Sequence, residues 1–473
     1  MSDDLNFEME VVKDRRSDRQ MQDSSEGRAS GSSVSHEVED LPEIERIPPG
    51  WELSTVGGIA QSTVGGGTPS KSNEDYWGGE IPWASVKDLD GTTVGDTEDF
   101  ITEEGVENSA TNLIPSGSVI ISTRMTVGEA FMNLVGMAIN QDLKAIRPDQ
   151  SQVNTHFLTY ALREKDRYLK SLGRGTTVSG ITTADLERTH LALPSLLEQR
   201  KIASVLYTVD QAIQTTEEII EQAKRVKQGL TQVLFRKGLH SEASDYEEVR
   251  FGPVLTQIPT HWNRARIGDV YSEHKLGTTE RGATEGEEHI PLIKMGNLGF
   301  GTWDFSEVER VDRDKKLIEE YHIEKGDLLF NTRNTPDLVG KTAIWDAEET
   351  AVYDNNLLRL RFGDEIESGY FANYYLSSSI GRRQLRARVH GTTSVAAIYW
   401  SDLQQVEIPV PPRDEQKEII RVLRRIDRAI NNNRDNRRGL QSIKKGLMQD
   451  LLTGEVRTAD KAVEILDEVK AHG

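Results

Sequence analysis

The chain has 473 residues, with 57 basic and 77 acidic side chains, a formal net charge of -20 and no cysteine. At about 150 residues per domain, this length leaves room for two or three domains. No stretch approaches the roughly 18 consecutive apolar residues that a membrane span needs, which excludes a transmembrane protein. Without cysteine, disulfides, thiolate nucleophiles and cysteine-ligated zinc are excluded as well.

The acidic balance argues against electrostatic binding of nucleic acid, because phosphate neutralisation normally needs a basic surface. Two alternatives remain open. Either the acidic side chains lie on faces away from the ligand, or the protein works in high salt, where an acidic surface keeps it soluble.

Residues 1–44 are rich in Ser, Asp, Glu and Gly and contain few aromatic or branched side chains. Such a composition cannot bury enough apolar surface to offset the entropy of ordering, so we expect a disordered acidic tail. The N-terminus also lacks the apolar segment of a secretory signal, which predicts a cytoplasmic protein.

Beyond this tail the sequence repeats itself once, in the same order and with an offset that stays between 209 and 217 residues. A conserved order with small drift indicates a tandem duplication of a unit of about 210 residues. The paired segments are PPGWELSTVGGI (48–59) with PTHWNRARIGDV (259–270), IPWASVKDL (81–89) with IPLIKMGNL (290–298), LIPSGSVIISTR (113–124) with HIEKGDLLFNTR (322–333), GTT (175–177) with GTT (391–393), TADLERTHLALP (183–194) with WSDLQQVEIPVP (400–411), and EQRKIASVL (198–206) with EQKEIIRVL (415–423).

Each copy begins with a region in which short apolar runs such as SVIIST and DLLFNT are bounded by Gly, Pro and Asn. These runs predict strands, and the region is expected to be an α/β (α+β) domain. The copy then ends in a stretch whose apolar residues recur every 3.5 residues, the period of a coiled-coil helix roughly 55 to 60 Å long. The predicted seam consists of Ile202, Leu206, Val209, Ile213, Ile220, Leu230 and Leu234, and of Ile419, Leu423, Ile426, Ile430, Leu440, Leu447 and Leu451.

Polar residues interrupt the second seam at Asn433 and Arg437. Polar seam positions can fix the register and orientation of paired helices at a cost in stability, and local fraying is the alternative. The expected organisation is an acidic tail (1–44), a first recognition domain (45–194), a central helix (195–240), a linker (241–258), a second recognition domain (259–411), a C-terminal helix (412–456) and a C-terminal tail (457–473).

No catalytic motif survives inspection. GGGTPSKS (65–72) resembles a phosphate-binding loop, but Ser70 stands where that pattern requires Gly before the Lys. The chain has no His-Glu-x-x-His, no Gly-x-Ser-x-Gly, no nuclease carboxylate motif and no amino-methyltransferase motif, and its ten His lack ligand spacing. We therefore expect neither catalysis nor a metal or cofactor site in this chain.

Basic and polar residues that recur at the same place in both copies are the remaining candidates for function. Arg124 and Arg333 each end an apolar strand, where a guanidinium can read guanine edges. The Gly-Thr-Thr segments are suited to phosphate contacts, although a structural turn with an internal salt bridge is the alternative. The candidate DNA contacts are Lys87, Arg124, Arg174, Thr176, Thr177, Lys294, Asn297, Arg333, Asn334, Arg388, His390, Thr392 and Thr393.

The twice-repeated pattern resembles the specificity subunit of Type I restriction-modification enzymes over about residues 45 to 456. Its most specific parts are the helix entries LPSLLEQRKI and VPPRDEQKEI and the helix ends KQGLTQVLFRKGL and KKGLMQDLLTGEV. The resemblance implies two target-recognition domains, each reading one half of a split DNA site, and two antiparallel helices that act as a spacer.

The resemblance also implies that the helices dock methyltransferase subunits, which a restriction and translocase subunit joins. S-adenosylmethionine, ATP and Mg would then belong to those partner chains. A different class of protein, a coiled-coil adaptor with two domains that bind protein or carbohydrate, is the alternative. Neighbouring methyltransferase and translocase genes would separate the two.

Overall fold

The computed structural model describes residues 41, 44, 46–89, 91–173, 180–239, 245–286, 288–391 and 395–457. The chain divides into a first unit, Met1–Ala203 with Gln449–Gly473, and a second unit, Ser204–Met448. Residues 1–40 and 458–473, for which tails were expected, lie outside the described part. No helix in the described part is both long and apolar enough to cross a membrane.

The first unit holds sheets of two, five and four strands, in the orders β1-β11, β2-β10-β7-β8-β4 and β5-β3-β9-β6. The strands are β1 (Glu52–Thr55), β2 (Ala60–Gly65), β3 (Trp77–Ala84), β4 (Thr93–Val94), β5 (Asp99–Ile101), β6 (Leu113–Ile114), β7 (Val119–Ser122), β8 (Ala130–Asn133), β9 (Met137–Ile139), β10 (Leu143–Pro148) and β11 (His190–Leu193). Its short helices are α1 (Glu103–Glu107), α2 (Thr155–Glu164), α3 (Asp166–Ser171) and α4 (Thr183–Arg188).

The second unit contains the strand orders β12-β13, β14-β25, β15-β22-β18-β20, β17-β16-β21 and β19-β24-β23. The strands are β12 (Tyr246–Phe251), β13 (Val254–Pro259), β14 (Asn263–Arg266), β15 (Tyr271–Leu276), β16 (His289–Ile293), β17 (Glu309–Asp312), β18 (Leu328–Asn331), β19 (Arg333–Asn334), β20 (Thr342–Ile344), β21 (Val352–Tyr353), β22 (Leu357–Phe362), β23 (His390–Gly391), β24 (Ala396–Ala397) and β25 (Glu407–Val410). Its short helices are α6 (Ile267–Val270), α7 (Lys315–Tyr321), α8 (Gly369–Ser377), α9 (Ser379–Arg386) and α10 (Trp400–Leu403).

The two units share one topology, as the duplication predicts. The four-strand orders β2-β10-β7-β8 and β15-β22-β18-β20 correspond strand by strand. In both units a parallel pair, β3 with β9 and β16 with β21, forms part of a second sheet. The predicted strands SVIIST and DLLFNT become β7 and β18, whose residues are all buried. Strands buried on both faces read as continuous apolar runs, which is why these two were readable from sequence.

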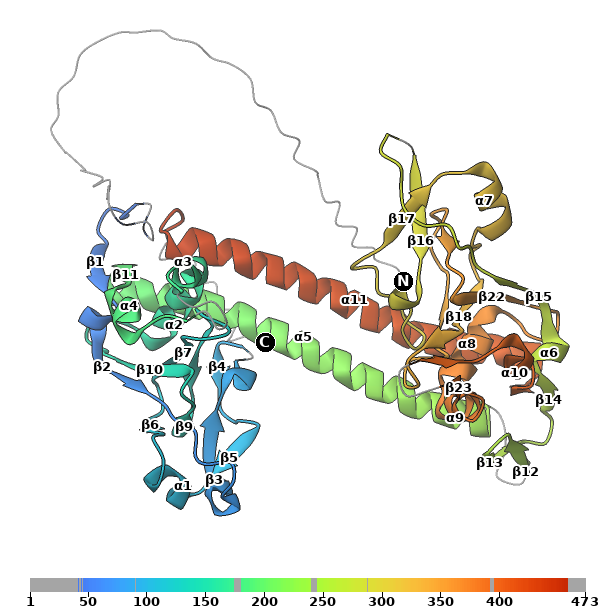
Figure 1. Ribbon diagram of the computed structural model, residues 1–473, viewed down its shortest axis with the longest axis horizontal. Helices are drawn as coiled ribbons and strands as arrows, with labels where there is room; N and C mark the ends of the chain where they lie inside the picture. Colours follow the sequence, from blue (N-terminus) through green and yellow to red (C-terminus); the bar gives the residue numbers. More distant parts are fainter. Residues whose placement is uncertain are drawn as a thin grey trace, which may run out of the picture. The chain divides into compact units, whose positions relative to one another are not determined.

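Two long helices complete the repeats: α5 (Leu196–Lys237, 42 residues) and α11 (Arg413–Leu452, 40 residues), coloured green and red in Figure 1. Each follows a Pro, which disfavours helix in the residue before it. Each ends at a glycine with positive φ, Gly238 (64°) and Gly454 (69°), the conformation that commonly closes a helix. The 42 residues of α5 correspond to about 63 Å.

The repeated Glu-Gln at the helix entries has a structural role. Gln199 accepts a hydrogen bond from the backbone N–H of Asn154 (2.8 Å) and donates to the carbonyls of Gln152 and Pro194. Gln416 accepts from the N–H of Glu367 (2.9 Å) and donates to the carbonyls of Glu365 and Pro411. Each glutamine is buried and ties its long helix to its own domain, because a buried amide must find partners.

The glutamates of this pair secure the place where the other helix ends. In the second unit, Glu415 accepts from the N–H of Leu239 (2.9 Å), from Trp262 Nε1 (3.0 Å) and from His261 Nε2 (3.0 Å). In the first unit, Glu198 forms a bidentate pair with Arg457, just beyond α11. The repeated Trp has its counterpart here too, since the Arg457 guanidinium lies over Trp51.

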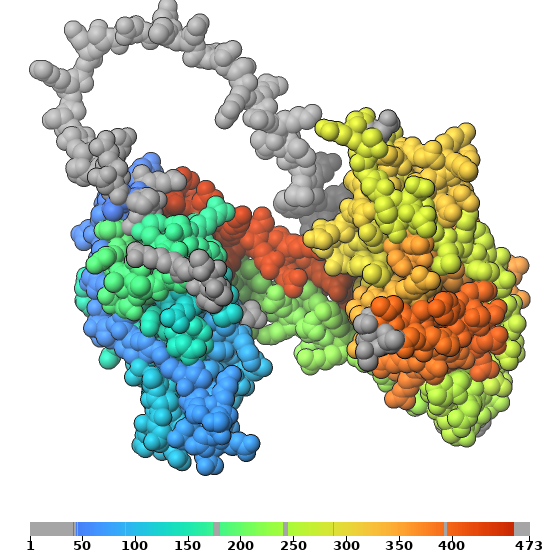
Figure 2. Space-filling model, in the orientation of Figure 1, coloured from blue at the N-terminus to red at the C-terminus, as the bar shows by residue number. Residues whose placement is uncertain are grey.

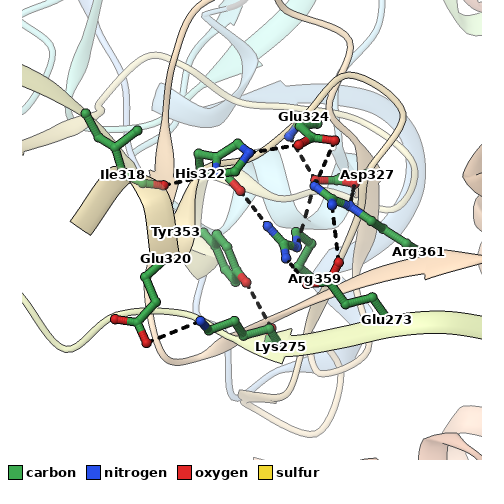
Figure 3. Close-up of polar contacts among 10 residues, drawn as sticks. All are labelled: Glu273, Lys275, Ile318, Glu320, His322, Glu324, Asp327, Tyr353, Arg359 and Arg361. Carbon is green, nitrogen blue, oxygen red and sulfur yellow. Dashed lines mark hydrogen bonds and ion pairs between the residues drawn. The ribbon is translucent and has the colours of Figure 1, made fainter. Parts of the chain in front are cut away.

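A network of buried charges holds the β15-β22-β18 sheet of the second unit together (Figure 3). Arg361 pairs in bidentate fashion with Asp327, at 2.6 and 3.0 Å. Arg359, almost fully buried, donates to the carbonyl of His322 (2.7 Å) and pairs with Glu273. Charges at this depth require such partners, since an isolated buried charge is very costly.

Candidate DNA interface

In the second unit, the strand-end arginine lies beside the segment that follows the Gly-Thr-Thr. Arg333 and His390 both pair in antiparallel register with Ala397 of β24, so they flank it from opposite sides. The amide of Ile398 also donates to the carbonyl of Thr332 (3.0 Å). The Arg333 side chain is exposed and forms no ion pair with any described carboxylate. It is therefore available to a ligand.

The first unit repeats this arrangement. Arg124 forms an antiparallel bridge with Gly180, and the amide of Ile181 donates to the carbonyl of Thr123 (2.9 Å). The Arg124 guanidinium lies 3.8 Å from Asp142 and its side chain is 56% exposed. Two positions predicted from sequence thus occupy equivalent exposed strand ends, and each sits where its Gly-Thr-Thr segment returns to the sheet.

The loop residues themselves cannot be placed. Arg174, Thr176, Thr177, Thr392 and Thr393 lie outside the described residues, so their assignment as phosphate contacts stays a prediction.

His390 remains a candidate, because its side chain is 58% exposed and its Nε2 lies 3.2 Å from Asp402. The exposed ring of Tyr399 is 6.0 Å away. An imidazole beside an exposed aromatic ring offers both a hydrogen-bond donor and a flat apolar surface to a ligand.

Asn297 and Arg388 have internal roles in the structure. The Asn297 side chain is buried, accepts from the N–H of Lys294 (2.9 Å) and donates to the carbonyls of Asp304 and Glu307. Its counterpart in the first repeat, Asp88, accepts in the same way from the N–H of Ser85 (2.8 Å). We therefore give Asn297 a role in shaping the loop and do not carry it forward as a DNA contact.

Arg388 donates to the carbonyls of Gln384 (2.9 Å) and Gln405 (3.0 Å), which joins α9 to the end of α10. These contacts match the internal alternative considered for this position. The two lysines are paired as well: Lys294 lies 2.6 Å from Glu309 and holds the pKa of that carboxyl below its usual range. Lys87 is exposed, 3.4 Å from Glu98.

One residue of the interface carried no sequence signal. Met125, next to Arg124, has a φ of 60°, and it is the sole non-glycine residue with positive φ in the described part of the chain. Its side chain is 69% exposed. This backbone conformation costs an L-residue roughly 1 to 2 kcal/mol, and such strain gathers at functional sites. At the matching position, Asn334 bonds internally to Asn331 and to the amide of Thr335.

The predicted seam residues all lie on buried or half-buried faces of the long helices. Fully buried are Ile202, Leu206, Ile220, Leu234, Ile419, Leu423, Ile430 and Leu451, and partly buried are Val209, Ile213, Leu230, Ile426, Leu440 and Leu447. The interrupted stretch of the second seam does not fray, because α11 runs through it without a break. Asn433 bonds to its own helix backbone.

Ion pairs within the second unit fix the two helices as antiparallel. Lys227 pairs with Asp427 (2.6 Å), Glu217 with Arg437 (3.4 Å) and Asp210 with Lys444 (2.5 Å). Moving back by 10 and then 7 residues on α5 moves forward by 10 and then 7 on α11, which defines one register. Arg437 therefore takes part in register rather than in fraying, as polar seam residues can.

The α5 helix carries a second apolar stripe outside the seam. With the seam at heptad positions a and d, Ile219, Val226 and Val233 occupy successive g positions and are 47%, 60% and 47% exposed. Apolar residues at a, d and g give a face wide enough for more than one neighbouring helix.

Fold and interface together define a protein with two recognition domains in tandem, each carried by a long helix. A family model described as the Type I restriction modification DNA specificity domain matches residues 48–225 and again 259–437. The chain belongs to this family: it is a Type I restriction-modification specificity subunit with two tandem target-recognition domains.

Similar proteins support this assignment. The chain is 26% identical over 433 residues to the Type I restriction enzyme MjaIX specificity subunit of Methanocaldococcus jannaschii, covering 88% of this chain and 96% of that one. It is 34% identical over 165 residues to the EcoR124I/EcoR124II specificity subunit of Escherichia coli, covering 34% and 41%. The crystal structure of the Type I S subunit from M. genitalium shares the fold, with a TM-score of 0.54 at 14% identity over 88% of this chain and 99% of that one.

Proposed function

We propose that each target-recognition domain reads one half of a bipartite DNA sequence through the loops around its strand-end arginine. The observation that carries this is the repeated juxtaposition of Arg124 and Arg333 with the segments that follow the Gly-Thr-Thr loops. An exposed guanidinium at a strand end suits bidentate recognition of guanine. The neighbouring residues differ between the repeats, with Met125 facing Asn334, which supports different half-sites.

Exchange of one domain tests this division of labour. Residues 48–190 are replaced by the same domain of a relative, and the methylated sequences of host genomes carrying each version are mapped. One half-site should change and the other should stay the same. The reciprocal exchange of residues 259–411 serves as the control. If either exchange altered both half-sites, the modular proposal would be refuted.

We further propose that the chain is not itself catalytic and that it acts in the cytoplasm as part of a complex. Methyltransferase subunits would supply S-adenosylmethionine chemistry, and a restriction and translocase subunit would supply ATP and Mg. The purified chain should neither methylate nor cut DNA, and methylation should depend on adding the methyltransferase subunit. Activity of the chain alone would contradict this proposal.

The exposed g-position stripe of α5 supports a docking role for the long helices. Replacing Ile219 and Val226 together by Glu places two charges on the stripe without touching the seam. Co-purification with the methyltransferase subunit should be lost while the helical circular dichroism is retained. Gln222→Glu, exposed on another face of the same helix, is the matched control. Retention of the subunit by the double variant would place the docking surface elsewhere.

A further inference from the structure

A groove of about 1030 Å³ lies inside the second unit, where α5, α8, α9, α11 and the loop around Trp303 meet. Figure 2 shows the green and red helices joining the yellow and orange surface of this unit. In a chain with a net charge of -20, the groove is lined by nine basic side chains and only three carboxylates. The basic residues are Lys224, Lys227, Arg382, Arg383, Arg386, Arg424, Arg428, Arg434 and Arg438.

The three carboxylates already have cationic partners. Asp346 pairs with Arg424 (2.9 Å), Asp427 with Lys227 (2.6 Å) and Asp435 with Arg438 (3.2 Å). Lys224 in turn pairs with Glu221 on its own helix. Five arginines therefore form no ion pair with any carboxylate of the described residues: Arg382, Arg383, Arg386, Arg428 and Arg434. The groove keeps an excess of positive charge.

This excess is held in place against electrostatic repulsion. The guanidinium of Arg382 stacks over the Phe300 ring, 3.4 Å from its centroid, and donates to the carbonyl of Asp337 (3.4 Å). Burial, together with the nearby charge of Arg386, lowers the pKa of Arg382. Like charges fixed side by side and partly desolvated are unfavourable, and a bound anion would offset that cost.

The duplication provides an internal control for these charges. Helix α11 matches α5 at a constant offset of 217 residues, which places Gln211 opposite Arg428 and Glu217 opposite Arg434. At the 216-residue offset of the Gly-Thr-Thr segments, Asp166 stands opposite Arg382. The same fold is thus built in the first repeat without these positive charges. They serve something other than folding.

The spacing of the arginines suits a polyanion. Arg424, Arg428, Arg434 and Arg438 lie on one face of α11, and the 14 residues between the first and the last span about 21 Å. One strand of duplex DNA carries a phosphate about every 3.4 Å along its axis, so this length matches roughly six phosphates.

We propose that this groove binds the phosphate backbone of DNA without reading bases, beside the half-site of the second domain. The inference rests on the proposed DNA recognition and adds to it an asymmetry, since only the second repeat has the groove charges. Binding energy from phosphate contacts is independent of sequence and strongly salt-dependent. The second domain should therefore contribute the larger share of the salt dependence.

The test compares two double variants of the full chain, each measured alone and assembled with its methyltransferase subunits. Arg428→Gln with Arg434→Gln removes two unpaired groove charges from α11. Arg421→Gln with Arg425→Gln removes two charges from the same helix outside the groove. Binding of a duplex containing the target site and of a scrambled duplex is measured between about 50 and 200 mM salt.

The slope of log binding constant against log salt should fall by about 1.8 for the groove variant, because each lost phosphate contact removes about 0.9. The slope should change much less in the control variant, and the ratio of target to scrambled affinity should be the same in both. Equal slope changes in the two variants, or an unchanged slope with weaker binding of the methyltransferase subunit, would overturn the proposal. The second outcome would identify the groove as a protein interface.

Failure of the recognition proposal has a different signature. If the unmodified chain bound target and scrambled duplexes equally, recognition would be refuted, yet the difference in slope between the two variants would still report on the groove.

Discussion

Arg333 is the side chain on which recognition by the second domain depends most directly. It is exposed, without an ion pair to any described carboxylate, and held by β-pairing to Ala397. Arg333→Ala should relax discrimination at one position of the second half-site by about 1 to 3 kcal/mol, the usual worth of a bidentate contact to guanine. Methylation of a library of randomised half-sites measures this.

Arg124→Ala provides the matched comparison and should relax only the first half-site. Equal weakening on all sequences would instead assign Arg333 to phosphate, because phosphate contacts carry no sequence information.

Glu415 gives the molecule a predictable response to acid. Burial raises the pKa of this carboxyl, but hydrogen bonds from the amide of Leu239, from His261 and from Trp262 outweigh it, so the pKa lies below its usual range. A lowered pKa in the folded state means that the stabilisation is complete above the ordinary pKa of about 4.3 and is lost as the pH falls below it.

Glu415→Gln should therefore reduce the free energy of unfolding by about 1 to 3 kcal/mol at pH 7. The difference from the unmodified chain should shrink as the pH falls below about 4.3. Denaturant unfolding at several pH values measures this, with the exposed Asp414→Asn as control. A difference that did not depend on pH would show that packing, and not the carboxylate, is what the substitution removes.

Among single residues, sequence could identify type and recurrence but not environment. Arg124 and Arg333 were found because both end a readable apolar strand. Asn297 looked like a polar candidate, yet its amide closes a turn, and only the geometry of its carbonyl partners shows this. Met125 gave no signal, because positive φ is a tertiary constraint that a methionine in a sequence does not announce.

At the scale of the helices, the seam was readable because its period repeats over many heptads, whereas the register was not. Register depends on partners about 200 residues apart, such as Lys227 with Asp427 and Asp210 with Lys444. These two pairs are equivalent under the 217-residue offset, so the duplication placed the same lysine and aspartate on both helices. Each is largely buried, which makes mismatched registers costly.

The pair of Lys227 and Asp427 should therefore couple the helices measurably. Asp427 also accepts a hydrogen bond from the Tyr374 hydroxyl (2.7 Å), which links the helix pair to α8. Lys227→Met should destabilise the chain by about 1 to 3 kcal/mol, less than for a fully buried pair because both side chains keep some exposure.

A double-mutant cycle with Asp427→Asn should give a coupling energy of about 1 kcal/mol or more. The exposed pair of Lys417 and Asp414 is the comparison and should give less than about 0.5 kcal/mol. Equal coupling in the two cycles would mean that the buried pair does not determine the register.

At the scale of the whole molecule, the duplication explains why one chain can hold two readers. Each unit repeats a sheet topology and a helix entry that the sequence alone disclosed through matched segments. The loops that differ between the repeats are where specificity would lie. The groove charges show a second consequence: once copied, equivalent positions are free to diverge, and Glu217 and Arg434 now carry opposite charges.

The final prediction concerns whether the helices set the gap between half-sites. A heptad inserted between Thr216 and Ala223 keeps the seam in phase and adds about 10 Å, close to three base pairs. In the antiparallel pair, a matching heptad is needed in α11 between Asp427 and Arg437. The ion pair of Lys227 with Asp427 then remains in register on one side of the insertions, and those of Glu217 and Asp210 remain on the other.

If the helices are the spacer, the doubly extended chain should methylate sites with both original half-sites and a gap enlarged by about three base pairs. The added length also rotates the second half-site by about 100° around B-DNA, so activity should fall in part. An insertion in α5 alone breaks the register and should lower the melting temperature. A doubly extended chain that stayed active only on the original gap would show that the helices dock partners without setting the spacing.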